Sequence, residues 1–431
     1  MPNVAFLEAS ADAWNRHDVD AIMASMTKDC VFVTSGGDRF EGQESVREIF
    51  VDIIGSFEDL RFEDPNHFAD GERGLSEWTF CGTDTEDGEQ MEIEGCDPFT
   101  FRDGLIAVKN TYEELKAEPL RHQDTKTPRH EEDEGEAKSP KTRLTVDVSE
   151  VEVKNVLTRT TGVLKTVTSH SLQLYRGCSY GNSMCGAGCY VQHSFWVTKG
   201  RKWESFLEVR RNAAEAYVTW VDAERRWAQK SGGQFGVFMS SSTDPFVPQE
   251  KKYGITKSIL NGMIASPPDV LILQTHSHQV VSYMDLILSL DEKCDLRVHL
   301  STETDRESFP GLPAHASPIS GRFDAARKLK ESGLRVVVTV SPLMPIEKPD
   351  VFFARIAASA VVIDHFIEGD GSRDGRRTLQ TALPEAIRSV DAEGVDLEYR
   401  DRMVEVAEKY MPGRVGVNVD GFAGRYGKAE S

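Results

Sequence analysis

Residues 334–364 read LRVVVTVSPLMPIEKPDVFFARIAASAVVID, and this stretch indicates the fold of most of the chain. It begins with an apolar run at 334–340, continues through a helical pattern at 351–358, and ends with a second apolar run at 360–364. A continuous run of β-branched residues is typical of a strand that is buried on both faces, as in a parallel sheet. The stretch therefore predicts one β–α–β unit.

The same alternation of strand and helix recurs on the N-terminal side of this stretch. Strand-like runs occupy residues 171–176, 205–209, 234–239, 270–274 and 296–300. Helical patterns lie between most of them, at residues 212–229, 255–263, 283–290 and 322–331. Repeated βα units predict a parallel sheet with right-handed crossovers. Polar residues gather just after the strand ends, which is where α/β barrels carry their chemistry.

Residues 1–115 have a different pattern. Helical patterns at 4–16, after Asp18 and at 44–56 come first, and strand-like runs follow at 76–82, 90–95, 97–102 and 105–112. The last two runs are joined by Arg-Asp-Gly-Leu, which is a hairpin signal. Helices followed by a meander predict an α+β unit in which a curved antiparallel sheet covers the helices and leaves a pocket between them.

The charge of the chain also divides at this point. The 431 residues carry a net charge of −20, and residues 1–115 hold 27 acidic and 8 basic residues of that total. Residues 116–143 are rich in charge, contain three prolines and have one large aliphatic side chain. Such a segment cannot bury enough apolar surface to offset its ordering entropy. We therefore expect a domain at 1–115, a linker at 116–143 and a second domain at 144–431.

Composition excludes several classes of protein. No run approaches the roughly 18 apolar residues of a membrane-spanning helix, and the N-terminus lacks the basic start and apolar run of a secretory signal. We therefore expect a cytoplasmic protein whose seven cysteines are reduced thiols. An acidic first domain is repelled by nucleic acid and by anionic membranes, so we expect neither as a partner.

Several segments of the first domain resemble one family. They are the helix with Trp14, then NRHD (15–18), TKDCVF (27–32), FEGQESVREIF (40–50) and GCDPFTFRDGLIAVKNTY (95–112). Together they resemble the SnoaL-like branch of the nuclear transport factor 2-like superfamily, which includes cyclases, isomerases, dehydratases and plain dimerisation modules. The resemblance implies a homodimer through residues 1–115. Asp97 is a candidate acid or base, although a lone carboxylate does not make an active site.

Three of the seven cysteines lie on one glycine-rich loop. Residues 174–190 read LYRGCSYGNSMCGAGCY, which places thiols at Cys178, Cys185 and Cys189. Three thiolates can converge on one metal centre, and the glycines let the backbone bend around it. A structural zinc ion would need a fourth ligand, for which His193 is a candidate. The residues alone leave an iron–sulfur cluster, a zinc ion and uninvolved thiols as alternatives.

The loop resembles the cluster loop of radical S-adenosylmethionine (radical SAM) proteins, in the branch of spore photoproduct lyase. That branch has a YRGC lead-in and a terminal CY, which match residues 175–178 and 189–190. The spacing here is C-x6-C-x3-C, where the family usually has C-x3-C-x2-C. Four further segments resemble motifs of the branch in the same order: STDPFVPQE (242–250), LQTHS (273–277, with His276 in place of a lysine), VHLSTETD (298–305) and SPLMP (341–345).

The resemblance implies a radical SAM enzyme with a partial (βα)6 barrel. It implies a [4Fe-4S] cluster on the three clustered cysteines, reduced by a flavodoxin or ferredoxin type donor. It also implies S-adenosylmethionine held by Thr243, Asp244, Ser301 and Glu303. Cleavage of S-adenosylmethionine would give a 5′-deoxyadenosyl radical that attacks a small-molecule or peptide substrate.

The catalytic candidates in this domain are His276, Asp364 and His365. Two alternatives stay open. One is a non-catalytic iron–sulfur binding or assembly protein that is dimerised by its SnoaL-like domain. The other is a SnoaL-like pocket enzyme, an isomerase, cyclase or dehydratase, with an accessory iron–sulfur domain. Fold and cofactor do not fix the substrate.

Overall fold

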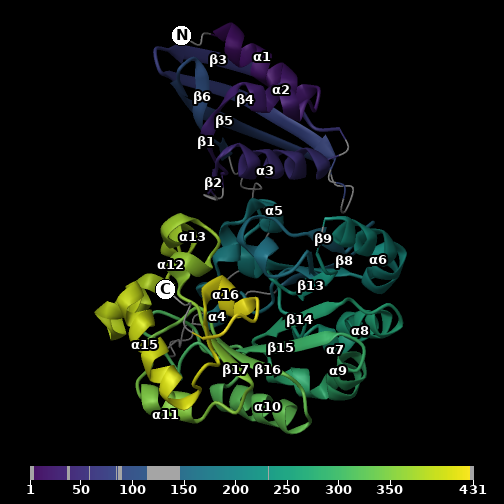
Figure 1. The fold of residues 1–431 in the computed structure, drawn as a ribbon, viewed down its shortest axis with the longest axis vertical. Coiled ribbons are helices and arrows are strands. Elements are labelled where there is room, and N and C mark those ends of the chain that lie inside the picture. The colour runs from purple at the N-terminus through teal and green to yellow at the C-terminus, as the bar shows by residue number, and fades with distance from the viewer. Residues whose placement is uncertain are drawn as a thin grey trace, which may run out of the picture.

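The computed structural model describes residues 4–35, 39–57, 59–83, 85, 90–113, 146–231 and 233–427. Its elements form two parts, which Figure 1 shows one above the other, and the first part ends with the strands before residue 114. The expected linker at 116–143 lies outside the described residues, so its boundaries stay a prediction.

The first part consists of three helices and one sheet. The helices are α1 (Val4–Asn15), α2 (Val19–Ala24) and α3 (Gln43–Gly55). The strands are β1 (Met26–Val33), β2 (Arg39–Glu41), β3 (Arg61–Asp70), β4 (Arg73–Thr83), β5 (Gln90–Arg102), β6 (Leu105–Asn110) and β7 (Tyr112–Glu113). They pair in the order β2-β1-β6-β5-β4-β3, with β7 on β5. The β1–β6 pair is parallel and the others are antiparallel.

The helices of the first part bury their apolar faces against this sheet. Trp14 of α1 and Phe32 of β1 both contact the ring of Phe50 in α3, with ring centroids 4.7 and 4.9 Å apart. These rings belong to one core that links all three helices to the strands. The predicted α+β unit with an antiparallel meander is confirmed. The runs predicted at 90–95 and 97–102 form a single strand, β5.

The second part is built on an eight-stranded sheet. Its strands are β9 (Leu157–Arg159), β10 (His170–Leu172), β13 (Gly236–Met239), β14 (Val270–Thr275), β15 (Asp295–Ser301), β16 (Val336–Val340), β17 (Ala360–Ile363) and β18 (Val415–Val417). They pair in the order β18-β17-β16-β15-β14-β13-β10-β9, and all pairs are parallel except β10–β9. A smaller sheet has the order β11-β12-β8 and contains β8 (Asp147–Val151), β11 (Tyr175–Gly177) and β12 (Phe206–Arg210).

Helices cover the larger sheet and connect its strands. The longer ones are α6 (Ala213–Lys230), α8 (Ile255–Ala265), α9 (Met284–Asp291), α10 (Ile319–Glu331), α14 (Leu383–Val390) and α15 (Leu397–Tyr410). The short α-helices are α4 (Met184–Ala187), α5 (Phe195–Thr198), α7 (Glu250–Tyr253), α11 (Pro349–Ala354), α12 (Phe366–Gly369), α13 (Arg376–Leu379) and α16 (Asn418–Phe422). The 3₁₀ helices are η1 (Gly162–Thr166), η2 (Tyr190–His193), η3 (Trp203–Ser205), η4 (His278–Tyr283), η5 (Arg373–Gly375) and η6 (Ala392–Val395). Among the described residues, every helix is too short or too polar to cross a bilayer.

The two faces of the larger sheet are covered differently. Figure 1 shows α8, α9 and α10 around its outer side, while α4 and α16 lie over its centre. Phe422 of α16 packs against Val337, Ala360 and Val362, which share one face of β16 and β17. The Phe422 ring also lies 6.3 Å from the Phe238 ring of β13 and 5.8 Å from the His299 ring of β15, measured between centroids, so α16 packs against several strands of the sheet.

Two predictions about this part need correction. The run at 171–176 is two strands in different sheets, and the run at 205–209 is β12 of the smaller sheet. The chain turns away after Leu172 because β11 pairs antiparallel with β12 and directs the cysteine loop over the end of the larger sheet. In the described chain, β9 and β18 are separate edges of an open sheet, so no closed barrel is formed and the partial (βα)6 barrel stays a prediction.

Candidate functional site

A cavity of about 340 Å³ opens where the parallel strands end. Its lining comes from the loops that follow each strand and from the cysteine loop above them. The lining residues that carry chemistry are Cys178, Cys185, Cys189, Ser240, Asp244, Gln274, His276, Glu303, Ser341, Asp364 and Asp370. Parallel strands bring the residues at their carboxyl ends to one edge, which is why positions so far apart in sequence meet here.

The cysteine loop is held by close backbone packing. Gly177 has φ +77°, which favours glycine, and its carbonyl accepts a 2.8 Å hydrogen bond from the Thr243 hydroxyl. A Cβ added at Gly186 would lie 2.3 Å from both the Gly181 Cα and the Tyr180 carbonyl oxygen. The loop is folded tightly onto itself, and only glycine fits at Gly186.

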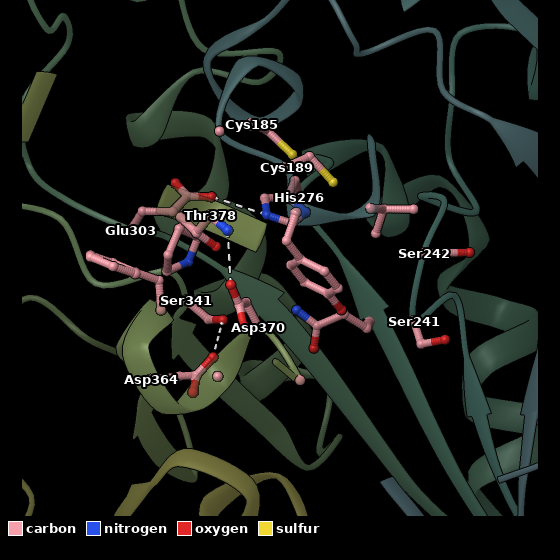
Figure 2. A pocket seen from close by; sticks show the side chains of 18 of the residues that line it. Cys185, Cys189, Ser241, Ser242, His276, Glu303, Ser341, Asp364, Asp370 and Thr378 are labelled. Carbon is pink, nitrogen blue, oxygen red and sulfur yellow. Dashed lines mark hydrogen bonds and ion pairs between the residues drawn. The ribbon is translucent and has the colours of Figure 1, made fainter. Parts of the chain in front are cut away.

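The three thiols lie at the same end of the cavity. Figure 2 shows the sulfurs of Cys185 and Cys189 there, and the three cysteines interact electrostatically with one another. Burial and the neighbouring thiols raise the pKa of Cys178 well above its usual value and that of Cys189 to about 12. Thiols with such raised pKa values lose their protons only when a strongly positive group, such as a metal centre, lies beside them.

The described residues contain no group of three or more His, Cys, Asp or Glu side chains arranged to hold a metal ion. His193, the fourth zinc ligand considered from the sequence, does not line the cavity.

Asp244 fixes the loop after β13. Its carboxylate accepts hydrogen bonds from the backbone amides of Phe246 (2.8 Å) and His276 (2.7 Å) and from the Thr275 hydroxyl (2.9 Å). Burial raises its pKa. Asp244 therefore ties two strand ends together while it lines the cavity, whereas Thr243 is buried outside the lining, with its hydroxyl bonded to Gly177.

His276, Glu303 and Arg322 form a charged chain that leads away from the thiols, in which Glu303 and Arg322 are buried and His276 is partly buried. The Nε2 atom of His276 lies 3.1 Å from Oε1 of Glu303, and a guanidinium nitrogen of Arg322 lies 2.7 Å from Oε2 of Glu303. Burial alone would lower the pKa of His276, but Cys185 and Glu303 raise it well above its usual value. Burial would raise the pKa of Glu303, but Arg322 and His276 hold it well below its usual range. Figure 2 shows the contact between His276 and Glu303.

A polar layer crosses the sheet beneath the cavity. The amide nitrogen of Gln274 donates to the hydroxyls of Ser301 (2.6 Å) and Thr339 (3.2 Å). Ser301 is thereby buried and does not line the cavity. The oxygens Gln274 Oε1 and Ser240 Oγ do belong to lining residues, are buried, and have no hydrogen-bond partner among the described residues. Buried polar atoms of this kind are rare and indicate an absent polar partner.

Asp364 follows β17, and one of its two carboxylate oxygens accepts a hydrogen bond. Its Oδ2 accepts a 2.7 Å hydrogen bond from the Ser341 hydroxyl, whereas Oδ1 has no partner in the described part of the chain. Burial, together with Asp370 and Glu368, raises its pKa to about 6. The adjacent His365 is buried outside the lining, with Nε2 3.2 Å from the Gly394 carbonyl and Nδ1 accepting from the Ile367 amide.

Sequence reasoning missed Ser240, Gln274, Ser341 and Asp370. Gln274 carried a usable signal, since a polar residue inside the apolar run 270–275 must face a partner or a cavity. Ser240 and Asp370 gave no such signal, because serine and aspartate after a strand or in a loop are common in turns.

Asp97, the candidate of the first part, lies in another environment. It is buried in β5, where it accepts hydrogen bonds from the Trp78 indole (2.9 Å) and the Thr111 hydroxyl (2.6 Å) and forms an ion pair with Lys109. The Lys109 ammonium also lies over the rings of Trp14 and Phe99. This group belongs to the first sheet and does not contribute to the cysteine cavity.

Residues 7–109 match the SnoaL-like domain family. The first part is a SnoaL-like domain. Solved structures similar to this chain include a candidate polyketide cyclase from Xanthomonas campestris pv. campestris, which is 25% identical and has a TM-score of 0.25. That match covers 26% of this chain and 89% of the other. A protein with a ketosteroid isomerase-like fold from Catenulispora acidiphila is 15% identical over 26% of this chain and 88% of its own, with a TM-score of 0.25.

Two relatives of the chain are themselves uncharacterized. Protein ORF301 of Acidianus two-tailed virus is 32% identical over 151 residues, which are 34% of this chain and 46% of the relative. The chain thus spans less than half the length of that viral protein. Protein MJ0683 of Methanocaldococcus jannaschii is 24% identical over 242 residues, which are 54% of this chain and 84% of the relative. Their names assign no activity, so function has to be argued from the site.

Proposed function

We propose that this chain is a radical SAM enzyme with an N-terminal SnoaL-like domain. The observation that carries the proposal is that Cys178, Cys185 and Cys189 line one cavity at the carboxyl ends of a parallel sheet. In the same cavity, Asp244, His276 and Glu303 lie on the loops after three neighbouring strands. The segments that resemble the family are therefore those that build the cavity.

The three thiols suit a cluster better than a single ion. A cubane binds each thiolate at a different iron, so its ligands surround a wider centre than the ligands of one zinc ion do. Cys185 and Cys189 both raise the pKa of Cys178, so the three thiols lie near one another in the cavity. Cys178, Cys185 and Cys189 would hold the cluster and leave its fourth iron for S-adenosylmethionine.

The remaining polar groups suit S-adenosylmethionine. Gln274 Oε1 and Ser240 Oγ are buried acceptors without partners among the described residues, and an amine or ribose hydroxyl would satisfy them. When bound, the cluster supplies the electron that cleaves S-adenosylmethionine into methionine and a 5′-deoxyadenosyl radical. The chain's part is to orient the cofactor through Asp244 and Glu303, both of which are buried and line the cavity.

Part of the wall of the same cavity is apolar. Leu164, Phe238, Phe366 and Phe422 contribute apolar surface to its lining. A radical centre attacks nearby C–H bonds and is lost to stray donors, so a dry and shaped cavity is required for selective chemistry. We assign substrate binding to this cavity, electron supply to a flavodoxin or ferredoxin type partner, and dimerisation to the SnoaL-like domain.

The first test concerns the cluster. Anaerobically reconstituted protein should be brown and hold about four irons and four sulfides per chain. Replacing Cys178, Cys185 and Cys189 with Ala should abolish the iron, whereas the matched control Cys294→Ala should retain it, because Cys294 lies in the turn before β15. Stoichiometric zinc without iron would overturn the proposal.

The second test separates an enzyme from a scaffold. Reduced, cluster-loaded protein with S-adenosylmethionine should release 5′-deoxyadenosine and methionine, and Gln274→Leu should weaken the binding of S-adenosylmethionine while leaving the iron content unchanged. A loaded cluster that never cleaves S-adenosylmethionine would favour the non-catalytic iron–sulfur alternative.

A further inference from the structure

Asp364 lies at the end of the cavity opposite to the thiols. Figure 2 shows Cys185 and Cys189 at one end of the cavity and Asp364 at the other, with Ser341 beside Asp364. A group that binds at Asp364 is therefore separated from the cysteine loop. This end of the cavity is the place for a substrate, since S-adenosylmethionine would occupy the end beside the thiols.

The Asp364 carboxyl group is buried yet half unsatisfied. Asp364 is 5% exposed, and its Oδ1 atom has no hydrogen-bond partner among the described residues. A Cβ added at Gly369 would lie 2.3 Å from Oδ1, so the backbone of α12 crowds the carboxyl group from one side. A buried acceptor of this kind is costly unless a ligand completes it.

The charges around Asp364 are already committed elsewhere. Asp370 accepts from the amides of Ser372 (2.9 Å) and Thr378 (2.8 Å) with its two oxygens. Arg400, the cation that acts on Asp364 from α15, is ion-paired with Glu368 and Asp401. Asp364 thus combines a hydroxyl donor on one oxygen with two acidic neighbours, and its own charge has no ion-pair partner in the described residues.

We propose that Asp364 binds a protonated amine of the substrate, with Ser341 holding one carboxylate oxygen and the amine completing the other. This inference rests on the proposed function, because it assigns a substrate class to the same cavity. An amine fits better than a neutral hydroxyl, since a desolvated carboxylate near two other acids gains most from a positive charge. Pro342, Met344 and Phe366 line the cavity and supply apolar surface for the rest of the molecule.

The test uses the full-length, cluster-loaded protein and two small probes of the same shape, benzylamine and benzyl alcohol. Near neutral pH, benzylamine should raise the melting temperature in a saturable way, and benzyl alcohol should not. Asp364→Asn keeps the shape and one acceptor but removes the charge, so it should weaken benzylamine binding about tenfold or more. Equal binding of both probes, or unchanged benzylamine binding in Asp364→Asn, would overturn the inference.

Two controls keep the result interpretable. Glu331→Gln removes an exposed acid that lies outside the cavity lining and is paired with Arg327, and it should retain benzylamine binding within about twofold. The iron content of Asp364→Asn should equal that of the parent protein, because Asp364 lies at the end of the cavity away from the thiols. If cofactor cleavage occurs and the amine does not bind, only this inference fails. If no iron is bound, the proposed function fails.

Discussion

Buried charges in this chain are of two kinds. Glu303 is balanced by Arg322 and His276, so its ionised form is stabilised. Asp364 has a hydroxyl donor but no ion-pair partner in the described residues, so its ionised form is destabilised. A balanced charge such as that of Glu303 supports the fold. An unbalanced charge such as that of Asp364 is tolerated at a site where a ligand is expected. Two predictions at the scale of single residues follow from this contrast.

Asp364→Asn should stabilise the ligand-free protein at about pH 8 and leave it unchanged near pH 4. Folding raises the pKa of Asp364 from 3.8 to about 6, so the folded state holds the proton more tightly. The contribution of Asp364 to the free energy of unfolding is therefore lost as the pH rises from about 4 to 6. The change in pKa corresponds to a loss of up to about 3 kcal/mol. Urea unfolding at both pH values measures it. A loss of stability at pH 8 would show that the carboxylate is structural.

Arg322→Met should lower the free energy of unfolding by about 3–5 kcal/mol, because it leaves Glu303 buried without its arginine. Arg322 is 2% exposed and also donates to the Ser301 carbonyl (2.8 Å). Arg327→Gln is the matched control on the same helix, since its ion pair with Glu331 is exposed to solvent and should contribute little to stability. Unfolding of both variants in denaturant measures the two changes in the free energy of unfolding. Similar small losses of stability in Arg322→Met and Arg327→Gln would mean that the buried pair of Arg322 and Glu303 does not stabilise the fold.

At the scale of elements, the cysteine loop depends on close backbone contact. Gly186→Ala would bring a Cβ within 2.3 Å of the backbone of Gly181 and Tyr180, so the loop has to open. We expect most of the iron to be lost after reconstitution. Gly188→Ala is the control, because its Cβ would meet only the Leu383 side chain at 3.2 Å or more. Iron content normalised to folded protein, checked by circular dichroism, measures both. Full iron in Gly186→Ala would contradict the packing argument.

The elements that could be predicted from sequence are those with a strong local signal. The apolar runs of β13 to β17 and the amphipathic helices between them were predicted from periodicity. β18 was missed because three residues, Val-Gly-Val, carry no period. The break between β10 and β11 was also missed, since antiparallel pairing with β12 decides it and that partner is distant in sequence.

For the site, the residue types were easier to predict than their contacts. Cys178, Cys185, Cys189, Asp244, His276, Glu303 and Asp364 all line the cavity. Thr243, Ser301 and His365 do not line it, and their side chains are hydrogen-bonded to Gly177, Gln274 and Gly394. A sequence shows which groups can make hydrogen bonds, but the fold determines which of them are already used.

At the scale of the whole molecule, we expect the two parts to be separable. Protease should cut within 116–143, because that stretch is charged, rich in proline and poor in apolar residues. Residues 144–431 should keep the iron and cleave S-adenosylmethionine, since every lining residue of the cavity lies there. Residues 1–115 should be a dimer without iron. Mass spectrometry of the fragments and size-exclusion chromatography check this, and a resistant core that contains 116–143 would contradict the boundary.

The cysteine loop precedes the strands that shelter it. During synthesis the ribosome releases Cys178, Cys185 and Cys189 before β14 to β17 and well before Phe422 of α16, which completes the cavity. Parallel pairings of distant segments form late in folding. The nascent chain therefore exposes three neighbouring thiols before the walls of the cavity form. If the chain holds the proposed cluster, these thiols have to stay reduced until the metal is delivered.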